Sequence, residues 1–491
     1  MIAQNNLSLF NTLTRKKEKF EPLNAPFVGL YVCGPTVYSD VHLGNCRTFI
    51  SFDLIYRYLL HLGFKVRYVR NITDAGHLEG DRDEGDDKFA KKARLEQLEP
   101  MEIVQRYTLG FHDVMRAFNT LPPSIEPTAT GHILEQIEMT KKIIENGYAY
   151  EANGSIYFDV EKYTKEHNYG ELTNRKLEDL LENTRELGGQ DEKKGRLDFA
   201  LWIKAKPEHI MRWPSPWGWG FPGWHIECSA MSTKYLGDTF DIHGGGMDLQ
   251  ATHHTNEIAQ SQACSHKAPV KYWLHTNMLT VNSVRMSKSA GNGFLPHELF
   301  TGNHPLLEKG YSPMAVRFFM MQTHYRSTLD FSNEALQAAE KGFAKLMTAL
   351  KTLKQLKTSA TSTSNITALV EAFYTAMNDD FNSPILIANL FEAVRIINSV
   401  NDGKESITIA DLNSLQTTVN TFVFDVLGLH DESENNNGGK ALDTVMQIVI
   451  EQRTEAKKRK DFATSDQIRD LLLAGGISIK DTKEGTIWQV D

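Results

Sequence analysis

The chain has 491 residues, of which 41% are hydrophobic and 23% are charged, and its formal net charge at pH 7 is −9. This composition is typical of a soluble protein of two or three domains, and four cysteines exclude a disulfide-rich scaffold. No apolar run approaches the ~18 residues of a membrane span, and residues 1–20 lack the layout of a secretory signal. We therefore expect a cytoplasmic protein without a membrane partner, in which RNA binding would need a local basic surface.

A strand, a helix and a second strand are predicted for residues 28–71. Residues 28–32 form a short apolar run that ends in a Cys-Gly-Pro-Thr loop. Apolar residues keep helical spacing over 45–62, and the glycine that follows predicts the end of the helix. Residues 65–70 alternate between apolar and polar side chains, as a strand does. This order predicts an α/β fold with a doubly wound parallel sheet, whose ligand lies at the carboxyl ends of the strands.

The part of the chain from about 78 to 215 is more charged and irregular. We interpret it as a connective insertion within a Rossmann-type catalytic domain that extends over residues 1–295. The end of the insertion, residues 213–224, is rich in proline, glycine and tryptophan, and is predicted to be irregular.

Helical periods replace the sheet pattern after residue 330. They cover about 333–356 and 366–428, with a Ser/Thr-rich linker at 358–365 between them. The spacing predicts a helical bundle domain over 333–430.

A second linker is predicted at residues 431–440, because this segment is acidic and rich in asparagine and glycine. It separates a small mixed domain, residues 441–491, for which we predict helices at about 442–460 and 465–473. A terminal hairpin follows them. The tail contains the dense basic run Lys457-Lys458-Arg459-Lys460, which is more often a solvated helix face than a binding site.

Two short motifs, far apart, indicate a site for the phosphates of ATP. His42-Leu43-Gly44-Asn45 lies where a loop enters a helix, so its side chains and backbone N–H groups can face phosphate. Arg285-Met286-Ser287-Lys288-Ser289 is followed by small residues, and its lysine can close over the β- and γ-phosphates. Each motif alone is usually structural. Together, in this order, they resemble the H-I-G-H and K-M-S-K-S signatures of class I aminoacyl-tRNA synthetases, with Asn45 and Arg285 as departures that keep hydrogen-bond donors.

The ATP-binding candidates are therefore His42, Gly44, Asn45, Arg285, Ser287 and Lys288. Of these, His42, Asn45 and Lys288 are the catalytic candidates. Attack of a carboxylate on the α-phosphate needs no covalent enzyme intermediate, so positioning and positive charge would provide most of the rate enhancement.

A second constellation could bind a metal. Cys33 follows the first strand, Cys228 lies in a Gly-Trp-His-Ile-Glu-Cys block, and His253 and Glu257 are four residues apart on one helix face. Two thiolates, an imidazole and a carboxylate suit tetrahedral zinc. The spacing alone does not decide this, because a buried cysteine is usually a small apolar residue, as we expect of the other two cysteines.

Four longer motifs resemble cysteinyl-tRNA synthetases, and the similarity extends over essentially the whole chain. They are Tyr31–Tyr38 (YVCGPTVY), Tyr68–Asp74 (YVRNITD), Gly223–Cys228 (GWHIEC) and Phe240–Asp248 (FDIHGGGMD). The resemblance implies one zinc ion per chain, bound by Cys33, Cys228, His253 and Glu257. Residues 251–257 read A-T-H-H-T-N-E where the family commonly has F-P-H-H-E-N-E, so the proline and the first glutamate are missing.

The resemblance also implies further site residues, for each of which ordinary loop or core packing is the alternative. For the substrate cysteine they are Gly34, Thr36, Thr73, Trp224, His243 and Asp248. For ATP, Gly244 and Gly245 would let the backbone approach adenine or ribose closely. For tRNA they are Lys457, Lys458, Arg459, Lys460 and Trp488, the last by stacking on an unpaired base or as a core residue.

The implied activity is that of a cysteine–tRNA ligase acting as a monomer. It would convert cysteine and ATP, with Mg²⁺, to cysteinyl-adenylate and pyrophosphate, and transfer cysteine to the 3′-terminal adenosine of tRNA(Cys). Zinc would select the substrate thiolate. Residues 296–332 would contact the tRNA stem and residues 441–491 the anticodon. Two alternatives remain: a ligase that joins cysteine to an amino sugar, which would lack the tail, and a non-catalytic RNA-binding relative, which would have lost phosphate or metal residues.

Overall fold

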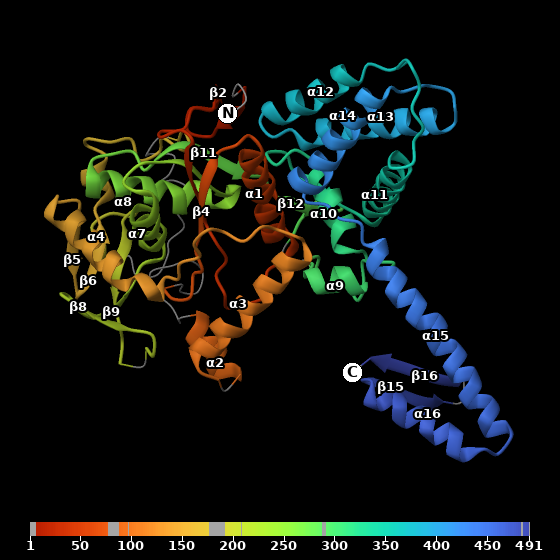
Figure 1. The fold of residues 1–491 in the computed structure, drawn as a ribbon. Coiled ribbons are helices and arrows are strands. Elements are labelled where there is room, and N and C mark those ends of the chain that lie inside the picture. The colour runs from red at the N-terminus through yellow and green to blue at the C-terminus, as the bar shows by residue number, and fades with distance from the viewer. Residues whose placement is uncertain are drawn as a thin grey trace. The chain divides into compact units, whose positions relative to one another are not determined.

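The computed structural model describes two compact units, Met1–Leu429 and His430–Asp491 (Figure 1). The residues described are 6–76, 88–96, 98–175, 192–207, 209–286, 291–482 and 485–490.

The core of the first unit is a four-stranded parallel sheet with the strand order β11-β10-β3-β4. Its strands are β3 (Phe27–Val32), β4 (Lys65–Arg70), β10 (Phe240–Gly246) and β11 (Val270–Thr276). The predicted strand, helix and strand are confirmed as β3, α1 (Leu43–His61) and β4. Because all four strands are parallel, their carboxyl ends share one edge, where β3 leads into Cys33 and β10 into its glycines.

Helices cover both faces of this sheet, as a doubly wound fold requires. Leu30 and Val32 pack in the same core cluster as the apolar residues of α1. Tyr31 and Cys33, which alternate with them along β3, pack instead with residues of α7 (Trp224–Leu236) and α8 (Thr255–Ser265). Figure 1 shows α1 on one side of the strands and α7 and α8 on the other. The α/β prediction is therefore confirmed.

The insertion contains more regular structure than expected. Its helices are α2 (Lys88–Glu96), α3 (Pro100–Ala117), α4 (Ile133–Glu145) and the short α5 (Val160–Tyr163). They accompany a five-stranded sheet of the order β5-β6-β7-β9-β8. Its strands are β5 (Ala149–Ala152), β6 (Ser155–Phe158), β7 (Phe199–Lys204), β8 (Trp213–Ser215) and β9 (Gly218–Pro222).

The prediction that residues 213–224 are irregular was wrong. This segment forms the β8–β9 hairpin and the first residue of α7. Its prolines fit because β8 is an edge strand and Pro222 is the last residue of β9. Gly220 is needed for packing, since a β-carbon there would lie 2.2 Å from Nε1 of Trp202 on β7.

Short elements connect the sheet to a helical bundle. They are β12 (Leu279–Val281), β13 (Val284–Arg285), α9 (Pro296–Thr301), α10 (Pro313–Met321) and β14 (Leu329–Phe331). The bundle consists of α11 (Asn333–Leu353), α12 (Ile366–Asn378), α13 (Ser383–Asn401) and α14 (Ile409–Asn420), which continues into a π-helical turn (Thr421–Val426). Side chains of Ser332, Asn365, Asn382 and Thr408 cap the four helices.

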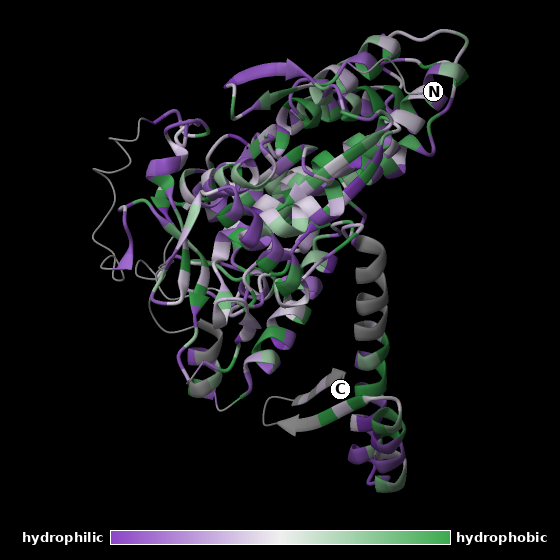
Figure 2. Ribbon diagram, turned by 90° about the vertical axis from the view of Figure 1, so that its left-hand side faces the viewer, coloured by the Kyte–Doolittle hydropathy of each residue, from purple (hydrophilic) through white to green (hydrophobic). Residues whose placement is uncertain are grey.

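The bundle helices carry hydrophobic and hydrophilic residues on the same helix, as amphipathic helices do (Figure 2). By length and composition alone, α13 is the one helix in the described ranges that could cross a membrane, and 44% of it is buried. Its buried residues belong to the main core cluster, which is the behaviour of a core helix.

The second unit contains α15 (Ser433–Lys458), α16 (Phe462–Ala474) and an antiparallel pair, β15 (Ile477–Thr482) and β16 (Gly485–Val490). Most of the predicted linker at 431–440 is helical, because α15 already begins at Ser433. Glycine disfavours a helix by about 1 kcal/mol relative to alanine and asparagine by somewhat less, but the backbone of this segment continues α15. A separate hairpin, β1 (Ser8–Asn11) and β2 (Lys16–Lys19), begins the first unit.

Candidate metal and nucleotide sites

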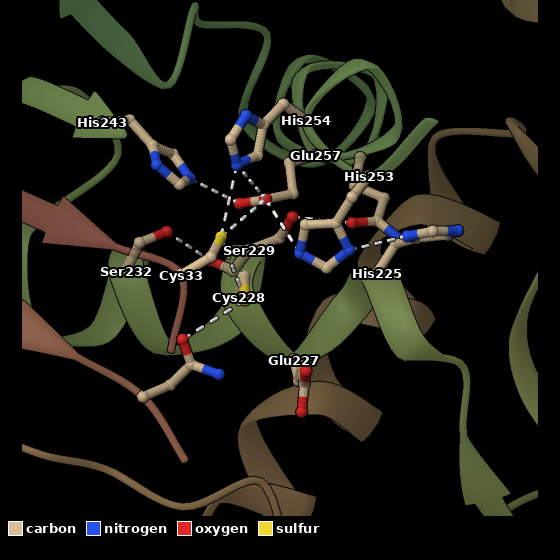
Figure 3. A network of polar contacts seen from close by, with 12 residues as sticks. Cys33, His225, Glu227, Cys228, Ser229, Ser232, His243, His253, His254 and Glu257 are labelled. Carbon is tan, nitrogen blue, oxygen red and sulfur yellow. Dashed lines mark hydrogen bonds and ion pairs between the residues drawn. The ribbon is translucent and has the colours of Figure 1, made fainter. Parts of the chain in front are cut away.

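The four predicted metal ligands lie together in the interior of the first unit. Cys33 follows β3, Cys228 lies on α7, and His253 and Glu257 come from a π-helical turn (Gln250–His254) and from α8. Their ligand atoms all lie within 4.8 Å of one another, and all four side chains are buried. Figure 3 shows the two sulfurs, the imidazole and the carboxylate directed toward a common point.

The distances between these atoms fit a tetrahedral zinc ion. Bonds of about 2.0–2.3 Å in a tetrahedron place the ligand atoms about 3.3–3.8 Å apart. The two sulfurs of Cys33 and Cys228 are 3.8 Å apart, and the Cys33 sulfur is 3.7 Å from Oε1 of Glu257. Nε2 of His253 lies 3.2 Å from the same oxygen. The donor set is therefore already arranged at the spacing that one metal ion requires.

The pKa values of the two buried thiols also indicate that a bound cation is needed to keep them ionised. Burial raises the pKa of Cys33 well above its usual value and the pKa of Cys228 to about 12. Without a positive charge both groups would therefore remain thiols at neutral pH. The hydroxyl of Tyr31 is buried beside them with no hydrogen-bond acceptor of ordinary geometry in the described ranges. A bound divalent cation would turn the sulfurs into thiolates and so into better acceptors.

Two further histidines border the quartet, and sequence reasoning did not place His254 there. Nε2 of His254 lies 3.3 Å from the Cys33 sulfur, and Nε2 of His243 lies 2.8 Å from Oε2 of Glu257. Cys33, His243, His254 and Glu257 thus form a second group at metal-ligand spacing. The adjacent His-His pair, three and four residues before a glutamate, was the signal that could have indicated this.

The missing proline before the histidines does not prevent a helix from forming there. The chain enters α8 through the π-helical turn Gln250–His254, and the Thr255 hydroxyl donates to the carbonyl of Gln250 at 2.8 Å. His253 and Glu257 thereby keep the one-turn separation that the predicted ligand pair needs.

Most of the residues expected to bind cysteine surround the quartet. The ring of Trp224 lies 4.7 Å from that of His253, and His243 is bonded to Glu257. Gly34 directly follows Cys33, and a β-carbon there would lie 1.6 Å from the carbonyl oxygen of Asn71, so only glycine fits.

Thr36 and Thr73 are paired by a backbone bridge, and Thr73 is buried. Asp248, by contrast, is exposed on the turn after β10. Sequence reasoning also missed Glu227, which is buried and accepts a hydrogen bond of 2.5 Å from the Thr73 hydroxyl. Burial raises the pKa of the Glu227 carboxyl well above its usual value, while that hydrogen bond lowers it.

The first ATP motif forms the entrance of α1. His42 is the N-cap residue, and its Nδ1 accepts from the backbone N–H of Asn45 at 3.3 Å. The Asn45 side chain accepts in return from the N–H of His42 at 3.2 Å. Asn45 is therefore the N3 residue of a capping box at the start of α1, and this explains structurally an asparagine at this position of the motif.

The second ATP motif is only partly within the described residues. Arg285 ends β13 and is exposed, whereas Ser287 and Lys288 lie outside the described ranges. Met286 packs against Gly44, where a β-carbon would lie 3.2 Å from the methionine methyl group.

Gly244 and Gly245 are buried in β10 and have packing reasons of their own. A β-carbon on Gly244 would lie 2.0 Å from the ring of Phe52, and one on Gly245 would lie 2.9 Å from Leu249. Core packing alone therefore already requires glycine at these two positions. Contact of either glycine with ATP remains a prediction.

The predicted tRNA residues belong to the second unit. Lys457 is half-buried, and Lys458, Arg459 and Lys460 are exposed around the end of α15. Trp488 is half-buried on β16, opposite Ile479 of β15. These placements are compatible with RNA contact by all five residues. They are equally compatible with a solvated surface for the basic residues and a core position for Trp488.

Comparison with known proteins agrees with this geometry. Residues 19–341 match the model for the tRNA synthetases class I (C) catalytic domain, and residues 372–431 match the DALR domain. Methionyl-tRNA synthetase of Mycobacterium tuberculosis, solved with methionyl-adenylate, shares the fold with a TM-score of 0.53 at 13% identity, over 82% of this chain and 89% of that one. The fold and the paired motifs are therefore those of a class I aminoacyl-tRNA synthetase.

Curated relatives identify the family. The chain is 58% identical to the cysteine–tRNA ligase of Porphyromonas gingivalis over 486 residues, 99% of each chain. It is 57% identical to that of Bacteroides fragilis over 489 residues, 99% of this chain and 100% of the relative. It is 55% identical to that of Cytophaga hutchinsonii, over 98% of each chain. The chain belongs to the cysteine–tRNA ligase family.

Proposed function

We propose that the chain activates L-cysteine with ATP to form cysteinyl-adenylate and then transfers cysteine to the 3′-terminal adenosine of tRNA(Cys). The observation that carries this proposal is the buried quartet of Cys33, Cys228, His253 and Glu257 at tetrahedral spacing. Its members would hold one zinc ion. When bound, zinc supplies an open coordination position that a substrate thiolate can take.

The quartet supports selection of cysteine over serine. A thiol ionises readily to a thiolate, which is a soft ligand, whereas a serine hydroxyl is hard and far less acidic. A site built around one strong polar contact can reject an analogue that lacks it by ~10⁴-fold or more, without an editing step. The half-buried ring of Trp224 against the buried His253 would shield that contact from water.

The two ATP motifs support adenylate formation. His42 and Asn45 lie at the entrance of α1, the positive end of the helix dipole, where negative phosphate is favoured. Lys288 would approach the phosphates, with Mg²⁺ accompanying ATP, from the loop that follows Met286. These residues would bind and orient the reactants, which is most of what this reaction needs.

The tail supports tRNA, rather than an amino sugar, as the acceptor. Residues 430–491 form a separate compact unit, and the curated relatives are matched over nearly their full length. We assign residues 333–430 as the helical bundle domain, 296–332 as the stem-contact segment and 441–491 as the anticodon-binding domain. Lys457, Lys458, Arg459, Lys460 and Trp488 would contact the tRNA. We further propose that the protein is a cytoplasmic monomer.

The decisive experiment is cysteine-dependent exchange of radiolabelled pyrophosphate into ATP by the zinc-loaded protein before tRNA is added. We expect exchange with cysteine and none with serine. The absence of cysteine-dependent exchange would overturn the proposal.

Cys228→Ser should lose both zinc and exchange. The matched control is Cys264→Ser, because Cys264 lies on α8 outside the quartet and should keep both. If Cys228→Ser retained zinc and exchange, the metal assignment would be wrong.

A further inference from the structure

Glu227 is a buried carboxyl group beside the site for cysteine, and its role is not explained by metal binding. It precedes Cys228 on α7, its side chain is 2% exposed, and it is directed away from the metal quartet (Figure 3). In the described ranges its hydrogen-bond partner is the Thr73 hydroxyl, and no cation pairs with it there. A buried carboxylate is costly to maintain unless a cation or a hydrogen-bond donor compensates its charge.

A continuous hydrogen-bond chain leads from the metal loop to Glu227. The N–H of Gly34 donates to Oδ1 of Asn71 at 2.9 Å, and Nδ2 of Asn71 donates to the Thr73 hydroxyl at 3.1 Å. The Thr73 hydroxyl in turn donates to Oε1 of Glu227 at 2.5 Å.

The direction of these hydrogen bonds determines how the Thr73 hydroxyl can interact with a ligand. A hydroxyl has one proton and two lone pairs. The proton is committed to Glu227 and one lone pair to Asn71, so the remaining lone pair can only accept a hydrogen bond. An ionised Glu227 would place negative charge behind that acceptor, which favours a cationic donor, and a bound cation would in turn stabilise the ionised carboxylate.

Thr73 is close to the residues that would bind the thiol of cysteine. Its backbone pairs with Thr36 of the loop that begins at Cys33, and Glu227 is next to Cys228 in sequence. The Asn71 side chain, which donates to the Thr73 hydroxyl, also accepts from the Cys228 thiol at 3.7 Å, so one amide group separates this acceptor from the quartet. In cysteine the α-ammonium group is separated from the thiol by only two carbon atoms, and it offers three donors and a positive charge.

We propose that Glu227 is a positioning residue for the α-ammonium group of the substrate. It holds the proton of Thr73, so that the threonine oxygen accepts from the ammonium group, and it supplies the opposing charge. The inference rests on the proposed function and deepens it, because the site would then select the amino group as well as the thiol.

The test compares two thiols that differ only in that group. L-Cysteine and 3-mercaptopropionate, which lacks the amine, are titrated calorimetrically into the zinc-loaded full-length chain. In Glu227→Gln, which keeps an acceptor oxygen but removes the charge, we expect cysteine to bind about 10- to 100-fold more weakly. Binding of 3-mercaptopropionate should change by less than about threefold, since a ligand without the ammonium group makes no use of that charge.

Equal weakening of both thiols would show a merely structural role and overturn the inference, as would unchanged binding of cysteine. Zinc content is measured on each variant to confirm that the quartet is intact. Glu171→Gln is the matched control, because this half-buried glutamate also accepts from a single neutral side chain, Gln262, and should bind both thiols as the parent protein does.

If Glu227→Gln does not fold, Thr73→Val and Thr73→Ser replace it. We expect the valine variant to lose affinity for cysteine alone and the serine variant to keep it, and the reverse would overturn the inference. Failure of the unmodified protein to bind cysteine or to exchange pyrophosphate would count against the proposed function instead, so the two failures are distinguishable.

Discussion

Met286 packs against Gly44, so the two halves of the split ATP motif touch although they are far apart in sequence. A β-carbon on Gly44 would lie 3.2 Å from the methionine methyl group and 3.1 Å from the ring of His42. The contact continues beyond the loop, because the N–H of Leu43 donates to the carbonyl of Phe294 at 3.0 Å. Met286 and Phe294, which lie on either side of Lys288 in the sequence, therefore both contact the entrance of α1.

Gly44→Ala should weaken ATP binding. The added methyl group would push Met286 and His42 outward, and crowding of this kind costs about 1–2 kcal/mol, which corresponds to roughly a tenfold change. The expected result is a KM for ATP about tenfold higher in pyrophosphate exchange, with the KM for cysteine little changed.

Gly293→Ala is the control for that change, because no atom lies within 4 Å of the position of its β-carbon. Its KM for ATP should stay near that of the parent protein. Adding Met286→Ala to Gly44→Ala should restore part of the loss; a KM for ATP that Gly44→Ala leaves unchanged would contradict the role of this contact.

Gly34→Ala should disrupt the metal site. Its methyl group would lie 1.6 Å from the carbonyl oxygen of Asn71, and backbone cannot yield as a side chain can. The loop after β3 must then move and take the Cys33 sulfur with it. We expect the purified variant to contain less than half of one zinc per chain by atomic absorption, an order-of-magnitude expectation for a site that loses one of four ligands.

The control for this variant is Gly110→Ala on α3, where the nearest atom to the added carbon is 3.8 Å away. Alanine favours a helix over glycine, so this change should leave zinc content intact and keep or raise stability. A full zinc complement in folded Gly34→Ala would show that the loop can adapt.

Much of the fold could be predicted because its signals are local. The β3–α1–β4 unit follows from apolar spacing and from the glycine after α1, and the bundle helices follow from their period. The order of the strands could not be predicted, since β10 and β11 join β3 through pairing between distant segments. The β8–β9 hairpin was missed because its prolines are tolerated only at the edge of a sheet that the sequence does not show.

The site was predictable to the extent that its residues occur in motifs. Cys33, Cys228, His253 and Glu257 were chosen by residue type and resemblance, and they do meet. Glu227 was missed because a glutamate in a helix is usually exposed, and its burial appears only when Thr73 is brought against it. No sequence pattern reports that kind of contact.

Asp53→Asn should strongly destabilise the first unit. The Asp53 carboxylate accepts from Arg57 at 2.8 Å and from Arg317, and all three side chains are buried. The two arginines also bond backbone carbonyls of residues 118–119 and 425–427, so this cluster joins α1, the insertion, α10 and the end of the bundle.

Removing the carboxylate charge leaves two buried guanidinium groups without a counter-ion, which costs about 3–5 kcal/mol. Urea denaturation followed by tryptophan fluorescence should show this loss. Arg395→Ala is the contrast, since its pairs with Glu392 and Glu405 are on the surface and it should change stability little. Equal effects of the two changes would contradict the importance of burial.

His61 should make the stability of the first unit depend on pH. It lies in the last turn of α1, stacked against Tyr58 and Tyr374, and its Nε2 is 3.2 Å from the Tyr374 hydroxyl. Burial lowers the pKa of His61 below its usual value, and the nearby Asp425 offsets this only in part. As the pH falls below about 6.5, the unfolded chain therefore binds a proton that the folded chain does not, and the free energy of unfolding decreases.

The contribution of His61 is thus fully present above about pH 6.5 and is lost as the pH falls toward the lowered pKa of the folded state. Melting midpoints measured at about pH 7.5 and about pH 5.5 should show a smaller decrease for His61→Gln than for the parent protein, because glutamine does not titrate. Part of the decrease should persist, since burial also lowers the pKa of His324. A decrease in His61→Gln as large as in the parent protein would mean that His61 titrates alike in both states.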